Sequence, residues 1–214
     1  MGAGALIAGP SDAPLVVLIH GLAGTHHTWD RVLPLIEPEA RVYALDLPGS
    51  ESIEQEADHA AQLIPGPAVL VGHSRGGLVA TAIAQRHPDL ARRLILLCTP
   101  WALESRLSAR RPVERTLALP VIGRLLWTAA RSGQQRQALR TAFAPGTPVP
   151  GQFVADLHAT GRQRLIAASR AIDTYLAEAP LAERLRASGV PAELIFGEHD
   201  ARIASPPPDT LAHT

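Results

Sequence analysis

The stretch around Ser74 constrains the fold more than any other part of the chain. Residues 68–71 are apolar and include two valines, which predicts a buried strand, and residues 78–86 place apolar side chains at helical spacing with no helix breaker. Ser74 therefore falls in the turn between a strand and a helix. Gly72 and Gly76 flank it two positions away on either side, as a sharp turn that strains the serine would require. The alternative is a glycine-rich loop whose serine only caps the helix.

Apolar runs elsewhere in the chain predict further strands. They cover residues 15–20, 41–45, 93–98 and 192–196, with a weaker edge strand at 5–8. Helical patterns at 29–36 and 52–64 lie between them, and the connections are too long for hairpins. We therefore expect an α/β fold, with a mostly parallel sheet of about five or six strands and helices on both faces. In such sheets ligands bind beyond the carboxyl ends of the strands.

The pattern changes at Trp101, where a long segment without strand signals begins. Its helical stretches cover residues 113–119, 122–143 and 153–176. Prolines, including Pro120, separate these stretches and are expected to break the helices. We interpret residues 101–176 as a helical cap inserted into an α/β core that comprises residues 1–100 and 177–214.

The composition excludes several kinds of chemistry. All 20 basic residues are arginine, which rules out a lysine Schiff base and a phosphate-loop lysine. The net charge of zero argues against a nucleic-acid partner. Residues 101–175 nevertheless hold 11 arginines against 4 acidic residues. If these arginines line the entrance to a site, they favour anionic acyl groups or a carrier such as coenzyme A.

Neither a membrane segment nor a cofactor is expected. The apolar runs are shorter than the roughly 18 residues that a membrane span needs, and the N-terminus lacks the charged region of a signal peptide, which predicts a cytoplasmic protein. Cys98 is the single cysteine and lies in an apolar run, so we expect a buried, inert thiol. His26, His27 and the dispersed carboxylates lack the spacing of metal ligands, and we predict no metal and no cofactor.

Four short motifs occur in one order along the chain. They are H-G-L-A-G at 20–24, D-L-P-G at 46–49, G-H-S-R-G-G at 72–77 and F-G-E-H-D at 196–200. Together they resemble the α/β-hydrolase family, in its capped esterase or thioesterase form, over about residues 15–205. The resemblance implies a serine hydrolase that cleaves a small-molecule carboxylic ester or thioester through an acyl-enzyme.

The resemblance also implies roles for individual residues. Ser74 would be the nucleophile, Asp200 the acid that orients the base, and the backbone N–H groups of Leu22 and Arg75 the oxyanion hole. The expected substrate-binding residues are Gly21, His73, Trp101 and Trp127. His20 and His73 match positions that the family uses for packing around the site.

The base is the point at which the sequence departs from the family. There the base is a histidine that follows a further helix and strand beyond the acid, whereas 14 residues follow Asp200 here. His213 is the sole histidine among them and is our candidate for the base. His158, His26 and His27, named below as outsiders, are weaker candidates for the same role. His199 is expected to be a loop residue, because adjacent side chains in an extended segment seldom face each other.

Three alternatives to an esterase stay open. A lactonase or a carbon–carbon bond hydrolase could use the same fold and the same nucleophile. A non-catalytic hydrolase-fold protein would bind a ligand under the cap. An inactive fragment, whose base lies in a missing C-terminal segment, would also show the motifs seen here. The sequence does not determine the oligomeric state.

Overall fold

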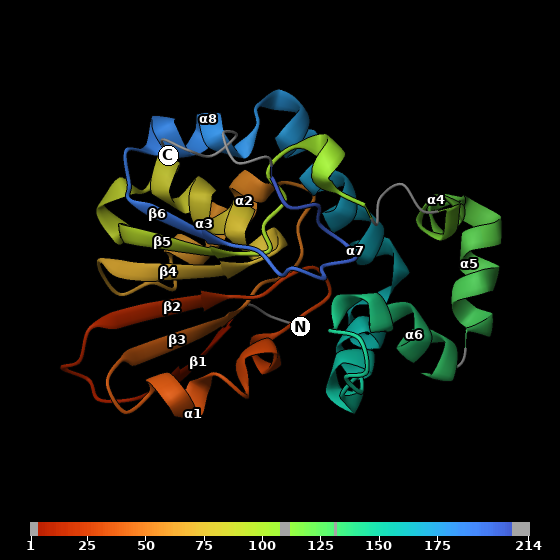
Figure 1. The fold of residues 1–214 in the computed structure, drawn as a ribbon, viewed down its shortest axis with the longest axis horizontal. Coiled ribbons are helices and arrows are strands. Elements are labelled where there is room, and N and C mark those ends of the chain that lie inside the picture. Colours follow the sequence, from red (N-terminus) through yellow and green to blue (C-terminus); the bar gives the residue numbers. More distant parts are fainter. Residues whose placement is uncertain (1–3, 108–111, 131, 207–214) are drawn as a thin grey trace.

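One six-stranded sheet organises the protein. The computed structural model describes residues 4–107, 112–130 and 132–206. The strands are β1 (Gly4–Ala8), β2 (Leu15–Ile19), β3 (Arg41–Asp46), β4 (Ala68–His73), β5 (Ala91–Leu97) and β6 (Ala192–Ile195). Their order in the sheet is β1-β3-β2-β4-β5-β6, with β1 antiparallel to β3 and the other neighbours parallel. The predicted α/β class and strand number are confirmed (Figure 1).

Alternation along the central strands sends side chains to two separate cores. Val17 and Ile19 of β2 pack into the larger core, whereas Leu18 packs into the smaller one with Trp29 and Leu33. Each strand is therefore apolar on both faces, which is why it reads as a continuous hydrophobic run. Burial on both sides fixes the register of the sheet, because a slip of one residue would exchange the two faces.

Helices supply the other half of each core. The larger core contains residues of α2 (Ile53–Ala61), α3 (Arg75–Arg86) and α8 (Leu181–Ser188), and the smaller core is closed by the 3₁₀ helix η1 (His26–Trp29) and α1 (Leu33–Ile36). The helix expected over 29–36 is thus two short pieces, because Pro34 permits only the first turn of a helix at α1. Further 3₁₀ helices among the described residues are η2 (Pro88–Leu90), η3 (Leu103–Ser105) and η5 (Arg140–Ala142).

A helical segment lies beyond the carboxyl ends of the parallel strands (Figure 1). It contains α4 (Pro112–Ala118), α5 (Pro120–Ala129), α6 (Ser132–Leu139) and the long α7 (Gly151–Glu178). The break predicted at Pro120 is confirmed, since α4 ends at Ala118 and Pro120 begins α5, where proline fits the first helical turn because its missing N–H is not needed. Gly161, with φ of 73°, kinks α7, and the part of α7 after the kink contributes to the larger core. The division into a core and a cap at residue 176 stays a prediction.

Over the described ranges, none of the helices has the length and apolar character needed to cross a membrane.

Candidate active site

Ser74 occupies a strained turn between β4 and α3. Its backbone has φ of 53° and ψ of −117°, a region that residues other than glycine rarely adopt, and α3 begins at the next residue. Its N–H donates to the carbonyl oxygen of Leu97 at 2.8 Å, which ties the turn to β5. The hydroxyl does not cap α3. The structure thus favours a nucleophile elbow over the alternative in which the serine caps the helix.

The glycines around Ser74 are needed because backbone segments meet there. A Cβ atom on Gly72 would lie 2.5 Å from the carbonyl oxygen of Gly76, and one on Gly76 would lie 2.6 Å from the carbonyl oxygen of His20. Real Cβ atoms essentially never approach so closely. Both obstacles are main-chain atoms, so a larger residue would have to move β2 or α3.

The loop after β2 turns back over the elbow. The N–H of Gly24 donates to the carbonyl oxygen of Gly21 at 3.2 Å, and Ala23 adopts a left-handed φ of 57°. Gly21, Leu22 and Arg75 all line one small cavity of about 40 Å³. The two residues that we predicted to form the oxyanion hole therefore border the same space, next to the N-terminus of α3.

His20 holds this loop and carries no charge. Its Nε2 accepts a hydrogen bond from the N–H of Leu47 at 3.1 Å, so the proton resides on Nδ1, which donates to the carbonyl oxygen of Gly21 at 2.8 Å. Burial lowers the pKa of His20, which favours this neutral form. Both ring nitrogens are occupied, and His20 cannot act as the base.

Asp200 lies in the turn that follows β6. Its Oδ1 accepts hydrogen bonds from the N–H groups of Arg202 at 2.7 Å and Ile203 at 3.0 Å. Burial lowers the pKa of His73, and the negative charge of Asp200 opposes that shift. Burial also raises the pKa of the half-buried Cys98 thiol, with Asp200 acting in the same direction, which suits the expected inert cysteine.

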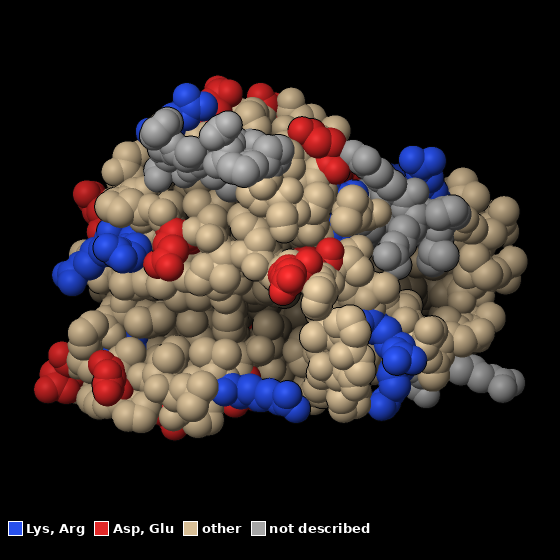
Figure 2. Space-filling model, viewed as in Figure 1, with Lys and Arg blue, Asp and Glu red and all other residues tan. Residues whose placement is uncertain are grey.

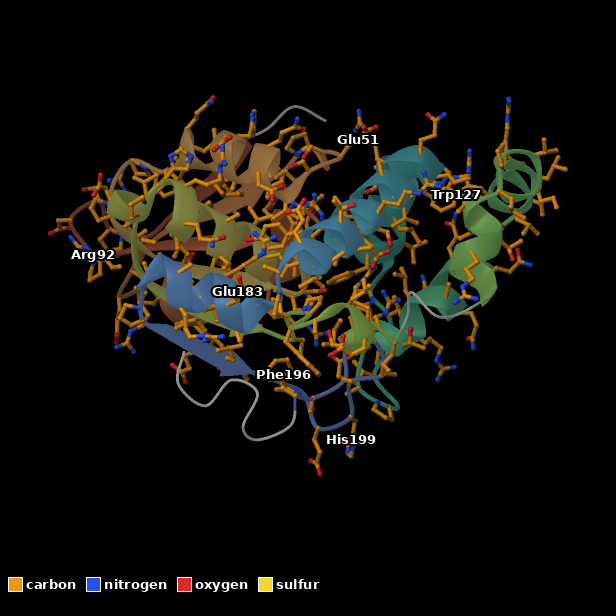
Figure 3. All side chains as sticks on the ribbon, turned by 90° about the horizontal axis from the view of Figure 1, so that it is seen from above. Glu51, Arg92, Trp127, Glu183, Phe196 and His199 are labelled. Carbon is orange, nitrogen blue, oxygen red and sulfur yellow. The ribbon has the colours of Figure 1, made fainter. Side chains whose placement is uncertain are left out.

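The other predicted residues are spread over the structure. The indole N–H of Trp101 donates to the carbonyl oxygen of Ala204 at 2.8 Å, and Trp127 lines a larger hollow between α5 and α7. His213 lies outside the described residues, so its role as the base stays a prediction. His199 points outward from the loop after β6, in agreement with the role expected of it (Figure 3).

The two histidines named as outsiders near the N-terminus are engaged by carboxylates. His26 donates its N–H to Asp46 Oδ1 at 2.7 Å and its Nδ1 contacts Asp46 Oδ2 at 2.8 Å, whereas His27 contacts Asp30. The contacts of His26 anchor the loop after β2 to Asp46 at the end of β3. His158, the outsider in the cap, is an exposed residue of α7. Among the residues with assigned positions, no group of three or more His, Cys, Asp or Glu is arranged to hold a metal ion.

Sequence reasoning missed a buried ion pair beneath the elbow. The carboxylate of Glu56, which is fully buried, contacts the guanidinium of Arg75, which is 2% exposed. The second oxygen of Glu56 accepts from the N–H of Ser50 at 2.9 Å. A signal was present, since Glu56 lies among Ile53, Ala57 and Ala60 on the buried face of α2.

It also missed a buried link between the cap and the loop after β2. The hydroxyl of Thr25 donates to Asp156 Oδ2 at 2.9 Å, and the side-chain amide of Gln152 donates to Asp156 Oδ1 at 2.9 Å. Thr25 and Asp156 are each 5% exposed. This pair joins residues 131 positions apart, and no local pattern could have indicated it.

A family model described as the alpha/beta hydrolase fold matches residues 14–193, which is most of the chain. The chain belongs to the α/β-hydrolase fold family. The match spans the loop after β2, the elbow and the cap, and it confirms the family that the four motifs resemble.

Several curated α/β hydrolases are similar in sequence. A pimeloyl-[acyl-carrier protein] methyl ester esterase of Neisseria meningitidis serogroup C is 34% identical over 213 residues, covering 90% of this chain and 77% of that protein. An esterase of the same name from Vibrio vulnificus strain YJ016 is 30% identical over 139 residues, covering 52% of this chain and 54% of that protein. The prediction of a hydrolase that acts on ester bonds is confirmed.

Solved α/β hydrolases share the fold at lower identity. A carboxylesterase structure from Nitrososphaera gargenis has a TM-score of 0.69 and 20% identity, covering 92% of this chain and 76% of that one. The enol-lactonase of Burkholderia xenovorans has a TM-score of 0.66 and 21% identity, covering 92% and 78%. These likenesses concern the fold alone.

Proposed function

We propose that this α/β hydrolase cleaves the methyl ester of an acyl group carried on an acyl-carrier protein, through an acyl-enzyme at Ser74. The strained backbone of Ser74 between β4 and α3 is the observation that carries the proposal, because it presents a nucleophile at the carboxyl edge of the sheet. The substrate class follows from the esterase of Neisseria meningitidis, with which the chain shares 34% identity over 90% of its length.

The mechanism assigns one task to each group. The Ser74 hydroxyl attacks the ester carbonyl carbon, and the N–H groups of Leu22 and Arg75 stabilise the negative charge that develops on the carbonyl oxygen. Methanol leaves as the acyl-enzyme forms, and water then releases the free carboxylate. The N-terminus of α3 favours the same developing charge.

The proton from Ser74 needs a base held by an acid. In our proposal Asp200 orients His213, which takes the proton from the serine hydroxyl and returns it to the departing methoxide. Asp200 supports this role because the turn after β6 fixes its carboxylate through two backbone N–H groups. The remaining oxygen, Oδ2, makes none of the hydrogen bonds that anchor this turn.

Two measurements on the full chain test the proposal. A fluorophosphonate probe should form an adduct that mass spectrometry locates at Ser74. Incubation with the methyl ester of pimeloyl-[acyl-carrier protein] should give a carrier product whose mass is lower by one methylene. Labelling at another residue would overturn the nucleophile. Labelling of Ser74 together with turnover of enol lactones, and none of the carrier-bound methyl ester, would overturn the substrate.

The link between Thr25 and Asp156 predicts a kinetic effect of the cap. Asp156→Ala removes the acceptor that holds the loop of Leu22, so kcat for a p-nitrophenyl ester should fall about tenfold with a smaller change in KM. Asp156→Asn should restore most of the activity, because its amide oxygen still accepts from Thr25 while Gln152 can rotate to accept from the new NH₂ group.

A double-mutant cycle separates positioning from general destabilisation. If Asp156 acts through Thr25, the combination of Thr25→Val and Asp156→Ala should be no slower than the worse single variant. Additive losses in kcat would contradict the link. Urea unfolding of each variant shows how much of the loss reflects a fall in the folded fraction.

A further inference from the structure

A hollow of about 600 Å³ lies between α5 and α7. Two of its lining residues, Thr160 and Arg164, also line the small cavity beside Leu22 and Arg75, so the hollow adjoins the candidate active site. Its lining residues are Pro120, Arg124, Trp127, Thr128, Thr160, Gly161, Arg162, Gln163 and Arg164. The labelled Trp127 can be seen between the two helices in Figure 3. The volume falls within the range of ordinary small-molecule sites, and the esterase mechanism does not use this space.

Two local features hold the hollow open. Gly161 has φ of 73°, and the resulting kink turns α7 away from a straight path beside α5. The guanidinium of Arg162 donates to the carbonyl oxygen of Leu117 at 2.9 Å, which ties α7 to the end of α4. This hydrogen bond fixes the residue after the kink to α4, which precedes α5 in the chain.

Among the described residues, the lining of the hollow carries positive charge only. Three arginines line it, and its lining contains no acidic residue. Within residues 115–164 there are seven arginines and a single acid, Asp156, whose carboxylate is already bonded to Thr25 and Gln152. In the part of the chain that the structure describes, no hydrogen bond or ion pair engages the guanidinium of Arg124 or Arg164. Arginine side chains are also visible over α6 on one face of the cap (Figure 2).

The hydroxyl groups of the two threonines that line the hollow are not free to donate to a ligand. The hydroxyl of Thr160 donates to the carbonyl oxygen of Asp156 at 2.9 Å, and that of Thr128 donates to the carbonyl oxygen of Arg124 at 3.0 Å. Their single hydroxyl protons are thus committed to α7 and α5. The charged donors that remain for a ligand are those of the arginines.

We propose that this hollow binds an organic phosphate, with guanidinium groups on the phosphate oxygens and the indole of Trp127 against an aromatic or apolar part. Planar guanidinium groups match phosphate oxygens in pairs, and several of them together favour an anion of more than one charge. A single inorganic phosphate would fill only a fraction of the volume, so the ligand carries more than the anion. The proposal does not depend on the esterase function, because binding is measured without turnover.

Calorimetric titration of the full chain at low salt tests the site with three probes. Pyrophosphate supplies the anion alone, adenosine the aromatic part alone, and ADP both. We expect ADP to bind more tightly than pyrophosphate and adenosine not to bind, with affinities that fall as salt is added. Absence of binding by both phosphates, or equal binding of adenosine and ADP, would overturn the proposal.

Variants assign the binding to the hollow. Arg124→Gln and Arg164→Gln should each weaken ADP and pyrophosphate about tenfold, because each removes a charged donor. Arg140→Gln is the matched control, since Arg140 is exposed on the cap and does not line the hollow. Trp127→Ala should weaken ADP and leave pyrophosphate unchanged. An equal loss in the Arg140 variant would show diffuse attraction by the cap and contradict a built site.

Discussion

Replacing Ser74 by alanine is expected to lower kcat for ester hydrolysis by about 10⁴-fold or more, because it removes the atom that forms the acyl-enzyme. The backbone N–H groups of Leu22 and Arg75 stay in place, and they account for any activity that remains above the uncatalysed rate. Steady-state kinetics with a p-nitrophenyl ester provide the measurement. Fluorophosphonate labelling should disappear in the same variant.

A serine remote from the elbow gives the matched control. Ser188 lies at the end of α8, where its hydroxyl donates to the carbonyl oxygen of Leu185 at 2.7 Å. Ser188→Ala should keep kcat within about twofold of the parent, because it leaves β4 and α3 untouched. If Ser74→Ala retained more than a tenth of the parent activity, the acyl-enzyme mechanism would be wrong.

A glycine at the same position separates strain from catalysis. Ser74 has φ of 53° and ψ of −117°, and glycine enters this region without the steric cost that a Cβ imposes. Ser74→Gly should therefore be as inactive as the alanine variant, yet more stable than it by about 1 kcal/mol or more. Such a result would identify the strain of the elbow as a cost that the fold carries for the position of the nucleophile.

The strands were predictable from the sequence where their side chains are buried on both faces of the sheet. β2 and β4 are apolar on both faces, so each appears in the sequence as an unbroken hydrophobic run. The elbow was predictable because glycine spacing, a buried strand and a helix coincide around Ser74. These local patterns all favour the same structure, and a sequence with such agreement allows the fold to be predicted.

The cap was less predictable, because its helix boundaries depend on contacts rather than on local signals. Pro120 marks the boundary between α4, which ends at Ala118, and α5, which begins at Pro120 itself. The region 122–143 was expected to be one helical stretch, whereas α5 ends at Ala129 and α6 begins at Ser132. Gly161, with φ of 73° and ψ of 160°, divides α7 into two helical parts, which composition alone does not indicate.

The buried carboxylates of the site were not predicted from the sequence, because their burial also depends on tertiary contacts. Residues 52–64 contain several acidic residues, yet Glu56 is fully buried because it pairs with Arg75 of a different helix. Asp156 is also buried, and the hydroxyl of the distant Thr25 donates a hydrogen bond to it. Burial of a carboxylate against a partner that is distant in the sequence is a tertiary property, and the helical spacing around Glu56 does not identify that partner.

The Glu56–Arg75 pair predicts the largest effect on stability. Glu56→Ala should lower the free energy of unfolding by about 3–5 kcal/mol, because it leaves the guanidinium of Arg75 buried without a counter-charge. The N–H of Ser50 would lose its acceptor as well, which loosens the loop that follows β3. Urea unfolding followed by circular dichroism measures the change.

Removing both charges together should cost much less than removing either one. Arg75→Met alone leaves the Glu56 carboxylate unpaired and should destabilise by a similar amount, whereas Glu56→Met combined with Arg75→Met replaces the pair by apolar volume.

The matched control is the exposed pair of Asp58 and Arg86, with a contact of 2.6 Å, for which Asp58→Asn should cost about 1 kcal/mol or less. A buried pair that cost no more than this exposed pair would contradict the prediction. Because Arg75 also lines the cavity beside Leu22, retained labelling of Ser74 in the double variant would show that the chemistry does not need the Arg75 side chain.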